Sequence, residues 1–370
     1  MPPLRIGVNA LYLIPGGVGG TEIYLRRVLA ALAELDPDNE YFVFTNRETA
    51  ADLAPAQANF HVVPQPVRAT SRPARILWEQ TGLPLAARRL RLDVLFNPGF
   101  TAPVFCACPQ ITTFHDLQHK RHPEYFRPLD LPFWRLCLWA AAHRSRRLMA
   151  ASEATRADLL HFYRLDPAKI RVVPYAADAE FFEIARDRET AAVEPYFLCP
   201  STSHPHKGLV PLLRAFAEVR RAHPEFRLVI TGVRGFHDQA VTAAIDELGL
   251  SGIARRTGWV PREELYKLFR HAFGFVYPST FEGFGIPVVE ALAAGVPAAC
   301  SRIEPLASIA GDAALLFEPA NEKAIAEALS RLITDEALRA HLAVEGPRQV
   351  RDYTWQNTAR AVLDAIRLTV

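Results

Sequence analysis

Short apolar runs typical of β-strands alternate with longer helix-like segments along almost the whole chain, and this alternation constrains the fold most. The first half contains seven such runs, at 5–11, 40–46, 59–65, 93–98, 110–116, 147–152 and 169–175. The second half contains six, at 195–201, 226–232, 254–260, 274–279, 297–301 and 313–319. Apolar residues at helical spacing lie between them, most clearly at 21–35, 208–223 and 321–334. Strand–helix alternation predicts an α/β fold with parallel sheets covered on both faces.

The length of the chain predicts two domains. A single hydrophobic core stops growing near ~250–300 residues, and this chain has 370. We expect a first Rossmann-like domain over 1–180 and a second over 190–350, with the boundary in 177–195, where charge rises and strand periodicity lapses. The last segment, 351–370, is expected to form a helix. Doubly wound domains bind ligands at the carboxyl ends of their strands, so a cleft between the domains is the expected site.

Composition excludes several classes of protein. Half of the residues are hydrophobic and 22% are charged, as in soluble globular proteins. The 42 basic and 40 acidic residues nearly balance, so nucleic acid is not an expected partner. Five cysteines without metal-site spacing favour a reducing, cytoplasmic location. No apolar run reaches the ~18 residues of a membrane-spanning helix, and the apolar N-terminus reads as a strand rather than a signal peptide.

A glycine-rich loop, "PGGVGGTE" at 15–22, follows the first predicted strand. Gly19 and Gly20 allow a ligand close to the backbone, and the helix that follows offers its positive end to a phosphate or sugar. The spacing does not match the dinucleotide fingerprint, and a tight turn without a ligand remains the alternative.

Polar residues follow two further strands. His115 and Asp116 end the run 110–116, although an isolated histidine is more often structural. In "STSHPHKGL", 201–209, Lys207 precedes a helix, where a cation is unfavourable for the helix dipole unless it binds something such as a diphosphate. His204 and His206 lack the further ligands that a metal site needs, so no metal is expected.

The segment "STFEGFGIPVVE", 279–290, places two carboxylates around a helix start. Pro287 suits the first helical turn, so the N–H groups of Gly283, Phe284 and Gly285 would form an anion site. Glu282 would lie beside the group that the phosphate carries. Glu290, among apolar neighbours inside the helix, suits the two hydroxyls of a ribose. About 12 Å of helix rise separates positions eight residues apart, which favours separate roles over a glycosidase pair.

These segments resemble the family 4 retaining glycosyltransferases of the GT-B fold. "FEGFGIPVVEALAAGVP" is similar to the E-x7-E motif of that family, and "GGVGGTEIYLRRVLAAL", "TTFHDL", "SHPHKGLVPLLRAFAEV" and "YTWQNTA" agree in order. The resemblance implies two Rossmann-like domains that face each other across a cleft, with the C-terminal helix crossing back onto the first.

The resemblance also implies roles for individual residues. Glu282, His115 and Lys207 would be catalytic, with Lys207 neutralising the diphosphate and His115 contacting the transferred sugar. Asp116 and Glu22 would bind the acceptor. The remaining residues would bind a nucleotide-sugar donor: Glu290, Gly283, Phe284, Gly285, Ile286, Gly19, Gly20, Val260, Ser201 and His206.

Two departures from the family pattern stand out. Many members carry an arginine where this chain has Ser201, and His204 or His206 would have to replace that cation. The usual turn "NGVD" reads "YAAD" here, at 175–178, and we expect little effect from this change.

The expected activity is transfer of a hexose from a nucleoside diphosphate sugar to a hydroxyl group, with retention of configuration and without a metal or another cofactor. "WEQTGLP", 78–84, resembles bacterial mannosyl-type members and favours GDP-mannose over UDP-sugars as donor. A catalytically silent nucleotide-sugar-binding subunit and a sugar-nucleotide epimerase of the same fold are the alternatives.

The acceptor is expected to be a glycan or a lipid-linked molecule in surface polysaccharide or glycolipid synthesis. The segment 121–147 mixes aromatic residues with arginines. It could dock on the inner face of the cytoplasmic membrane, or it could be a core helix with a solvated basic face.

Overall fold

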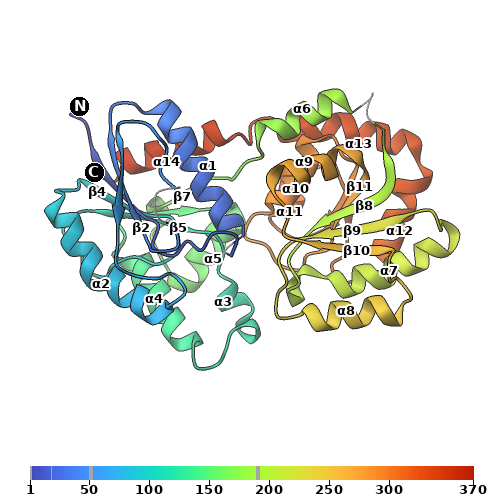
Figure 1. Ribbon diagram of the computed structural model, residues 1–370, viewed down its shortest axis with the longest axis horizontal. Coiled ribbons are helices and arrows are strands. Elements are labelled where there is room, and N and C mark those ends of the chain that lie inside the picture. The colour runs from blue at the N-terminus through green and yellow to red at the C-terminus, as the bar shows by residue number, and fades with distance from the viewer. Residues whose placement is uncertain (1, 18, 50–52, 189–191) are drawn as a thin grey trace. The chain divides into compact units, whose positions relative to one another are not determined.

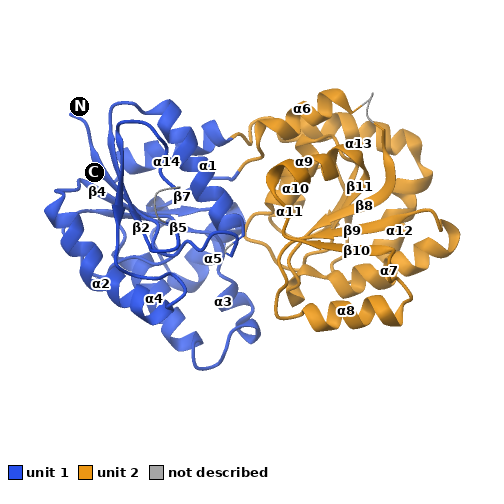
Figure 2. Cartoon of the chain, in the orientation of Figure 1, with its two compact units in different colours: residues 1–175, 355–370 blue, residues 176–354 orange. Residues whose placement is uncertain are grey.

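The computed structural model describes residues 2–17, 19–49, 53–188 and 192–370. It divides the chain into two compact units (Figure 2). Unit 1 comprises 1–175 and 355–370, and unit 2 comprises 176–354. Residue 190, the expected start of the second domain, lies outside the described residues.

Unit 1 contains a seven-stranded parallel sheet with the order β3-β2-β1-β4-β5-β6-β7. Its strands are β1 (Arg5–Asn9), β2 (Glu40–Thr45), β3 (Phe60–Pro64), β4 (Val94–Asn97), β5 (Gln110–Phe114), β6 (Arg147–Ala150) and β7 (Ile170–Val172). Its helices are α1 (Gly20–Leu35), α2 (Arg72–Arg89), α3 (Gln118–Arg121), α4 (Leu131–Arg144), α5 (Glu153–Tyr163) and α14 (Trp355–Arg367), with short 3₁₀ turns at Pro123–Tyr125 and Pro167–Lys169 (Figure 1).

Unit 2 contains a six-stranded parallel sheet with the order β10-β9-β8-β11-β12-β13. Its strands are β8 (Glu194–Pro200), β9 (Arg227–Thr231), β10 (Ala254–Gly258), β11 (Ala272–Tyr277), β12 (Ala298–Ser301) and β13 (Leu315–Phe317). Its helices are α6 (Ala179–Asp187), α7 (Leu209–Ala222), α8 (Asp238–Glu247), α9 (Arg262–His271), α10 (Ile286–Ala293), α11 (Leu306–Ala310), α12 (Glu322–Thr334) and α13 (Glu336–Gln349), with a 3₁₀ turn at Pro205–Lys207.

Each of the thirteen predicted strand-like runs overlaps one observed strand, so the prediction of two parallel α/β sheets is confirmed. The division falls at 175/176, ahead of the expected boundary region. The reason is α6, which belongs to unit 2 because it buries Phe181 and Ile184 there. The ring of Phe181 lies 5.0 Å from that of Phe269 on α9.

The strand order defines where ligands can bind. In unit 1 the order reverses between β1 and β4, and in unit 2 it reverses between β8 and β11. At such switch points the loops leave neighbouring strands in opposite directions, which opens a crevice at the carboxyl ends of the strands. In unit 2 these loops carry Lys207 and Glu282, and in unit 1 the glycine-rich loop follows β1.

Candidate functional site

Lys207 and Glu282 meet at the switch point of unit 2. The Nζ atom of Lys207 lies 2.6 Å from Oε1 of Glu282, and the two side chains are 15% and 11% exposed. Nζ also donates to the hydroxyl of Tyr277, at 3.2 Å. Burial, and next the charge of Glu282, raise the pKa of Tyr277 well above its usual range, so this phenol stays neutral. The two residues that the sequence proposed as partners of one phosphorylated sugar are therefore in direct contact.

Main-chain contacts hold these two loops together. The carbonyl oxygen of His206 accepts from the N–H of Thr280 at 2.7 Å and from the hydroxyl of Ser279 at 3.0 Å. Gly208 follows Lys207 with φ +64°, and a Cβ there would lie 2.1 Å from the carbonyl oxygen of Pro278. Only glycine allows the two backbones to approach this closely.

The loop after Glu282 leads into the N-terminus of α10. Phe284 and Ile286 are buried, and Gly285 caps the helix with φ +111°. Pro287 occupies the first turn, as predicted. The positive end of the helix dipole is thus placed one loop away from Lys207, an arrangement that favours an anion.

Glu290 is a buried carboxylate with an ion-pair partner that the sequence analysis missed. Its Oε1 accepts from Nη1 of Arg262 at 2.7 Å. Arg262, at the start of α9, also binds Asp178, which in turn accepts from the hydroxyl of Tyr266 at 2.7 Å. Burial alone would lower the pKa of Arg262, but the charges of Glu290 and Asp178 together raise it above its usual range.

Asp178 ends the turn at 175–178 and is the one residue that "YAAD" shares with the usual "NGVD". It is 2% exposed and pairs with Arg262, so the part of the turn that carries this ion pair is unchanged. No sequence signal points to this pair, because the two residues lie 84 positions apart.

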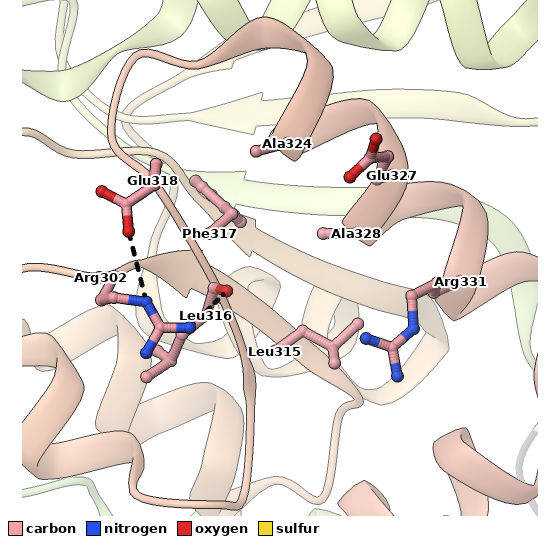
Figure 3. Close-up of a pocket in the computed structure, with 9 residues that line it drawn as sticks. All are labelled: Arg302, Leu315, Leu316, Phe317, Glu318, Ala324, Glu327, Ala328 and Arg331. Atoms are coloured by element: carbon pink, nitrogen blue, oxygen red, sulfur yellow. Dashed lines mark hydrogen bonds and ion pairs between the residues drawn. The ribbon is translucent and has the colours of Figure 1, made fainter.

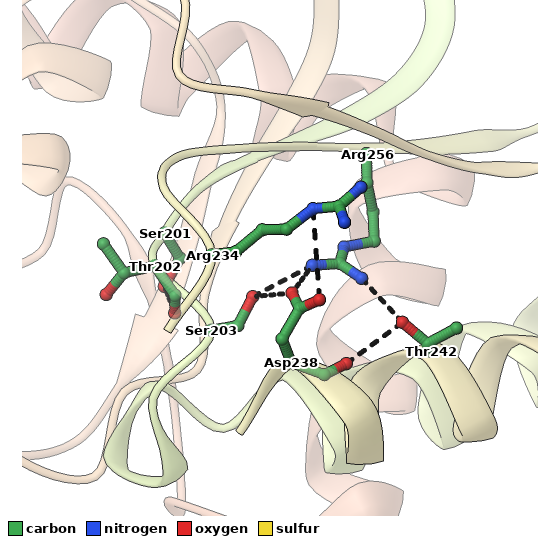
Figure 4. A network of polar contacts seen from close by, with 7 residues as sticks. All are labelled: Ser201, Thr202, Ser203, Arg234, Asp238, Thr242 and Arg256. Atoms are coloured by element: carbon green, nitrogen blue, oxygen red, sulfur yellow. Dashed lines mark hydrogen bonds and ion pairs between the residues drawn. The ribbon is translucent and has the colours of Figure 1, made fainter. Parts of the chain in front are cut away.

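Two arginines from other segments, Arg234 and Arg256, lie near the loop that contains Ser201 and Ser203 (Figure 4). Arg256 on β10 binds Asp238 and, at 3.1 Å, the hydroxyl of Ser203. Arg234 follows β9, is 78% exposed at its side chain, and lies 3.9 Å from Asp238. Burial, and next the charge of Lys207, lower the pKa of His204, so this ring is a poor substitute for the missing cation near Ser201. His206 stacks with it, the ring centroids 5.8 Å apart.

Val260 and the pocket of unit 2 lie apart from these contacts. Val260 follows β10 and is half-buried. A pocket of about 230 Å³ lies between β13 and α12 (Figure 3). None of the predicted site residues lines it; its walls are Arg302, Leu315, Leu316, Phe317, Glu318, Ala324, Glu327, Ala328 and Arg331.

In unit 1, Glu22 holds the glycine-rich loop in place. Its carboxylate accepts from the N–H of Gly16 at 2.7 Å and from Nε of Arg26 at 2.8 Å. Gly19 precedes α1 with φ +60°, and a Cβ there would meet nothing within 4 Å. Gly19 therefore has open space beside its backbone, while the carboxylate of Glu22 already has partners.

His115 is buried and neutral. Its Nε2 lies 2.7 Å from the carbonyl oxygen of Pro98, and its Nδ1 contacts the hydroxyl of Tyr175. The carbonyl can only accept, so Nε2 carries the proton and Nδ1 accepts from the tyrosine. Burial lowers the pKa of His115 to about 4, against the opposing effect of the bond to Pro98. A contact with a sugar would require the ring to exchange one of these partners.

Asp116 is next to His115 and is half-buried. Its Oδ1 accepts from the N–H of Gln118 at 2.8 Å, which fixes the turn into α3. The structure gives this predicted acceptor residue a clear local role at the carboxyl end of β5.

Glu79 is a second residue that the sequence analysis did not single out. It is 1% exposed, and its carboxylate accepts from Asn9 at 3.2 Å and from Thr101 at 2.9 Å. Asn9 ends β1 and Thr101 follows β4, the two strands at the switch point of unit 1. Burial raises the pKa of Glu79 above the usual range, against the charge of Arg75. A sequence signal for Glu79 exists in "WEQTGLP", because this carboxylate shares one side of α2 with the buried residues Ile76 and Leu83.

Among the residues that the structure describes, no cluster of three or more histidine, cysteine, aspartate or glutamate side chains could hold a metal ion. Within the same residues, no helix combines the length and the apolarity needed to cross a membrane.

Comparisons with known proteins support this organisation. The model of "Glycosyltransferase Family 4" matches residues 18–181, and that of "Glycosyl transferases group 1" matches 181–349. The chain is 27% identical to O-antigen chain mannosyltransferase B of Escherichia coli over 70% of each chain. It is 29% identical to an MMP alpha-(1->4)-mannosyltransferase of Mycolicibacterium hassiacum over 59% of this chain, and it spans about half of that relative (53%).

The fold agrees with solved structures. The crystal structure of WaaG, a glycosyltransferase involved in lipopolysaccharide biosynthesis, matches with a TM-score of 0.76 at 17% identity, over 98% of this chain and 99% of that one. Because the two family models together span 18–349 and both units have the parallel α/β architecture of such enzymes, this chain belongs to the family 4 glycosyltransferases of the GT-B fold.

Proposed function

We propose that the protein is a retaining, metal-independent hexosyltransferase that uses a nucleoside diphosphate sugar. The observation that carries this proposal is the placement of Lys207 and Glu282 beside the start of α10 at the switch point of unit 2. An ammonium group and a helix N-terminus supply positive charge where a leaving diphosphate gathers negative charge. Glu290 lies in the same helix and would bind the ribose.

The ion pair also has a consequence for donor binding. Lys207 donates to Glu282 and Tyr277, and an ammonium group has three N–H donors. A phosphate oxygen can take the third donor while Glu282 remains close enough to contact the sugar. The departing phosphate would then help to deprotonate the acceptor on the same face of the sugar.

Mannose is the favoured sugar, with GDP-mannose as donor. The two mannosyltransferase relatives support this choice. We propose that the acceptor is a hydroxyl of a glycan or a lipid-linked molecule, that Asp116 and Glu22 contribute to its site in unit 1, and that the enzyme acts in the cytoplasm in bacterial surface polysaccharide or glycolipid synthesis.

A donor panel tests this proposal. The purified chain is incubated with GDP-mannose and UDP-sugars, with and without EDTA, and the release of nucleoside diphosphate is measured. Release that survives EDTA and is fastest with GDP-mannose is the expected result. No release from any donor would indicate a silent binding subunit, and isomerised donor without an acceptor would indicate an epimerase.

Substitution of the lysine provides the matching prediction. Lys207→Ala should lower turnover roughly 100-fold or more, because it removes a preorganised cation from the leaving group. Lys267→Ala is the control, since its side chain is 71% exposed and its nearest carboxylate, on Glu264, lies 3.8 Å away. Near-normal turnover of the Lys207 variant, with an unchanged circular dichroism melt, would overturn the assigned role.

A further inference from the structure

The helix α4 is apolar on both of its faces, although only one of them is covered. Leu138, Ala141 and Ala142 pack into the core of unit 1 against Phe114 and Leu148. A helix that is hydrophobic all round is normally buried all round, in a core or in a membrane. The opposite face of α4 has no such cover among the described residues.

Three large apolar side chains form this uncovered face, and we call them the α4 stripe: Phe133, Leu136 and Trp139. Their residues are 45%, 62% and 49% exposed. Leu129, just before the helix, is 93% exposed. Phe105 is 73% exposed, and its ring lies 5.0 Å from the guanidinium carbon of Arg144 at the end of α4. Exposed apolar side chains that gather in this way mark an interaction surface.

Arginines lie along both margins of the stripe. With about 100° of rotation per residue, the three stripe residues span about 120° of the helix surface. Around the helix axis, Arg135 lies about 40° outside the edge of the stripe that Trp139 forms. Arg144 lies about 20° outside the opposite edge, which Phe133 forms. Such side chains keep their charge at the margin of an apolar surface while their carbon chains lie along it.

The charge of the surrounding segment has one sign. Between residues 127 and 146 the chain carries four arginines and a single acidic residue, Asp130. The arginines are Arg127, Arg135, Arg144 and Arg146, and all four are exposed. An apolar stripe between cations matches the acyl-chain boundary and the anionic headgroups of a lipid bilayer.

A second copy of the chain fits the same surface less well. In a two-fold symmetric dimer the stripe would face itself, so Arg135 and Arg144 of both copies would be brought together, and like charges at an interface are unfavourable. The 14 residues of α4 are about 21 Å long, too short to span a bilayer.

We propose that the α4 stripe and its flanking arginines dock unit 1 onto an anionic membrane surface, with α4 lying in the plane of the interface. From its sequence, the segment 121–147 could be either a membrane-docking segment or a core helix with a solvated basic face. The structure shows a core helix whose outer face is apolar and edged by arginines. The proposal concerns a surface only and does not depend on the identity of the donor.

Vesicle binding tests the proposal with the full chain. The protein is sedimented with vesicles of phosphatidylglycerol and phosphatidylcholine in equal parts, and with vesicles of phosphatidylcholine alone, at low and high salt. We expect binding to the anionic vesicles at low salt and little binding to the neutral ones. Absence of binding to the anionic vesicles, or equal binding to both, would overturn the proposal.

Variants of the surface identify the docking residues. Leu136→Ser and Trp139→Ser should each weaken binding roughly tenfold or more, because each removes buried apolar area. Arg135→Gln should weaken it about fivefold. Val344→Ser on α13, whose residue is 50% exposed, and Arg331→Gln on α12 are matched controls that should bind normally. Normal binding by all three stripe-region variants, or a concentration-dependent dimer that Leu136→Ser dissociates, would contradict membrane docking.

Discussion

At the scale of single residues, the proposed donor site of unit 2 depends on a chain of buried charges. Asp178, Arg262 and Glu290 form consecutive ion pairs, and the two carboxylate side chains are 1% and 3% exposed. Arg262 donates to Oε1 of Glu290 and so fixes one of its carboxylate oxygens. The residue expected to bind a ribose is thus positioned by an arginine that itself contacts no ligand in our proposal.

Removal of this arginine is predicted to affect stability and donor binding together. Arg262→Gln leaves two carboxylates buried without their cation, and breaking a buried pair costs about 3–5 kcal/mol. We expect the free energy of unfolding in urea to fall by about that amount and the donor KM to rise more than kcat falls. Lys267→Gln, on the exposed side of the same helix, should change neither quantity. Unchanged stability of the Arg262 variant would refute the positioning role.

The protonation of His115 gives a second prediction at this scale. Its pKa is lowered from 6.5 to about 4. Above pH 6.5 both folded and unfolded chains leave the ring neutral. As the pH falls toward 4 the unfolded chain takes up a proton that the folded chain does not, so the fold loses up to about 3 kcal/mol through this residue. Below about pH 4 the loss levels off.

NMR titration of the His115 ring measures this directly, with the resonance assigned by comparison with His115→Gln. We expect no protonation until the pH approaches 4. A midpoint near 6.5 would show that the ring is open to solvent and able to act as a proton donor at neutral pH.

The residues also show which part of the site a sequence can reveal. The sequence alone singles out Lys207, Glu282 and Glu290, because each lies within a few residues of a predicted helix start. Arg262 and Asp178 could not, because their pairing depends on which strands are neighbours in the sheet and not on spacing along the chain. His115 could be singled out because it follows a strand, but its burial and its contacts with Pro98 and Tyr175 depend on how three loops pack.

At the scale of elements, the strands were predictable and the helix α6 was not. The apolar runs of the strands are continuous because parallel strands are covered on both faces, so each one was visible in the sequence. The segment that forms α6 is rich in charged residues, a pattern that predicts a domain boundary and not a buried helix. Only Phe181 and Ile184 of this helix are buried, and two apolar residues three positions apart are a weak helical signal.

The approach of two loops at Gly208 yields an element-scale prediction. Gly208→Ala and Gly249→Ala both place alanine at φ +64°, so each should cost about 1 kcal/mol from the left-handed backbone. Only at position 208 does the new Cβ meet a carbonyl oxygen, at 2.1 Å, whereas position 249 has nothing within 4 Å. We therefore expect the Gly208 variant alone to displace Lys207 and lose most of its turnover. Equal activity of the two variants would show that the loop can shift without cost.

At the scale of the whole molecule, the two ends of the chain belong to one unit. The last helix, α14, packs on α1, and Thr358 donates to the carbonyl oxygen of Pro174 at 2.8 Å. Val362 and Ile366 are fully buried in this contact. Unit 1 is therefore complete only after the whole of unit 2 has been synthesised.

A substitution in α14 should consequently weaken unit 1 and spare unit 2. Ile366→Asp buries a charge among apolar side chains, which costs several kcal/mol. Hydrogen exchange should show faster exchange throughout 1–175 and unchanged protection in 176–354. Arg360→Gln, on the exposed side of the same helix, serves as the control. Uniform loss of protection in both units would show that they unfold as a single body.

The entry and exit of unit 2 lie side by side. The N–H of Ala177 donates to the carbonyl oxygen of Tyr353 at 3.2 Å, and Ala177 pairs with Thr354 as an isolated bridge. A segment whose two ends meet can be cut out at one place and replaced by another of the same kind. Unit 2, residues 176–354, is thus a domain inserted into the sequence of unit 1. Recombination at these two junctions could exchange the unit that we propose binds the donor in a single event and leave the rest of the gene unchanged.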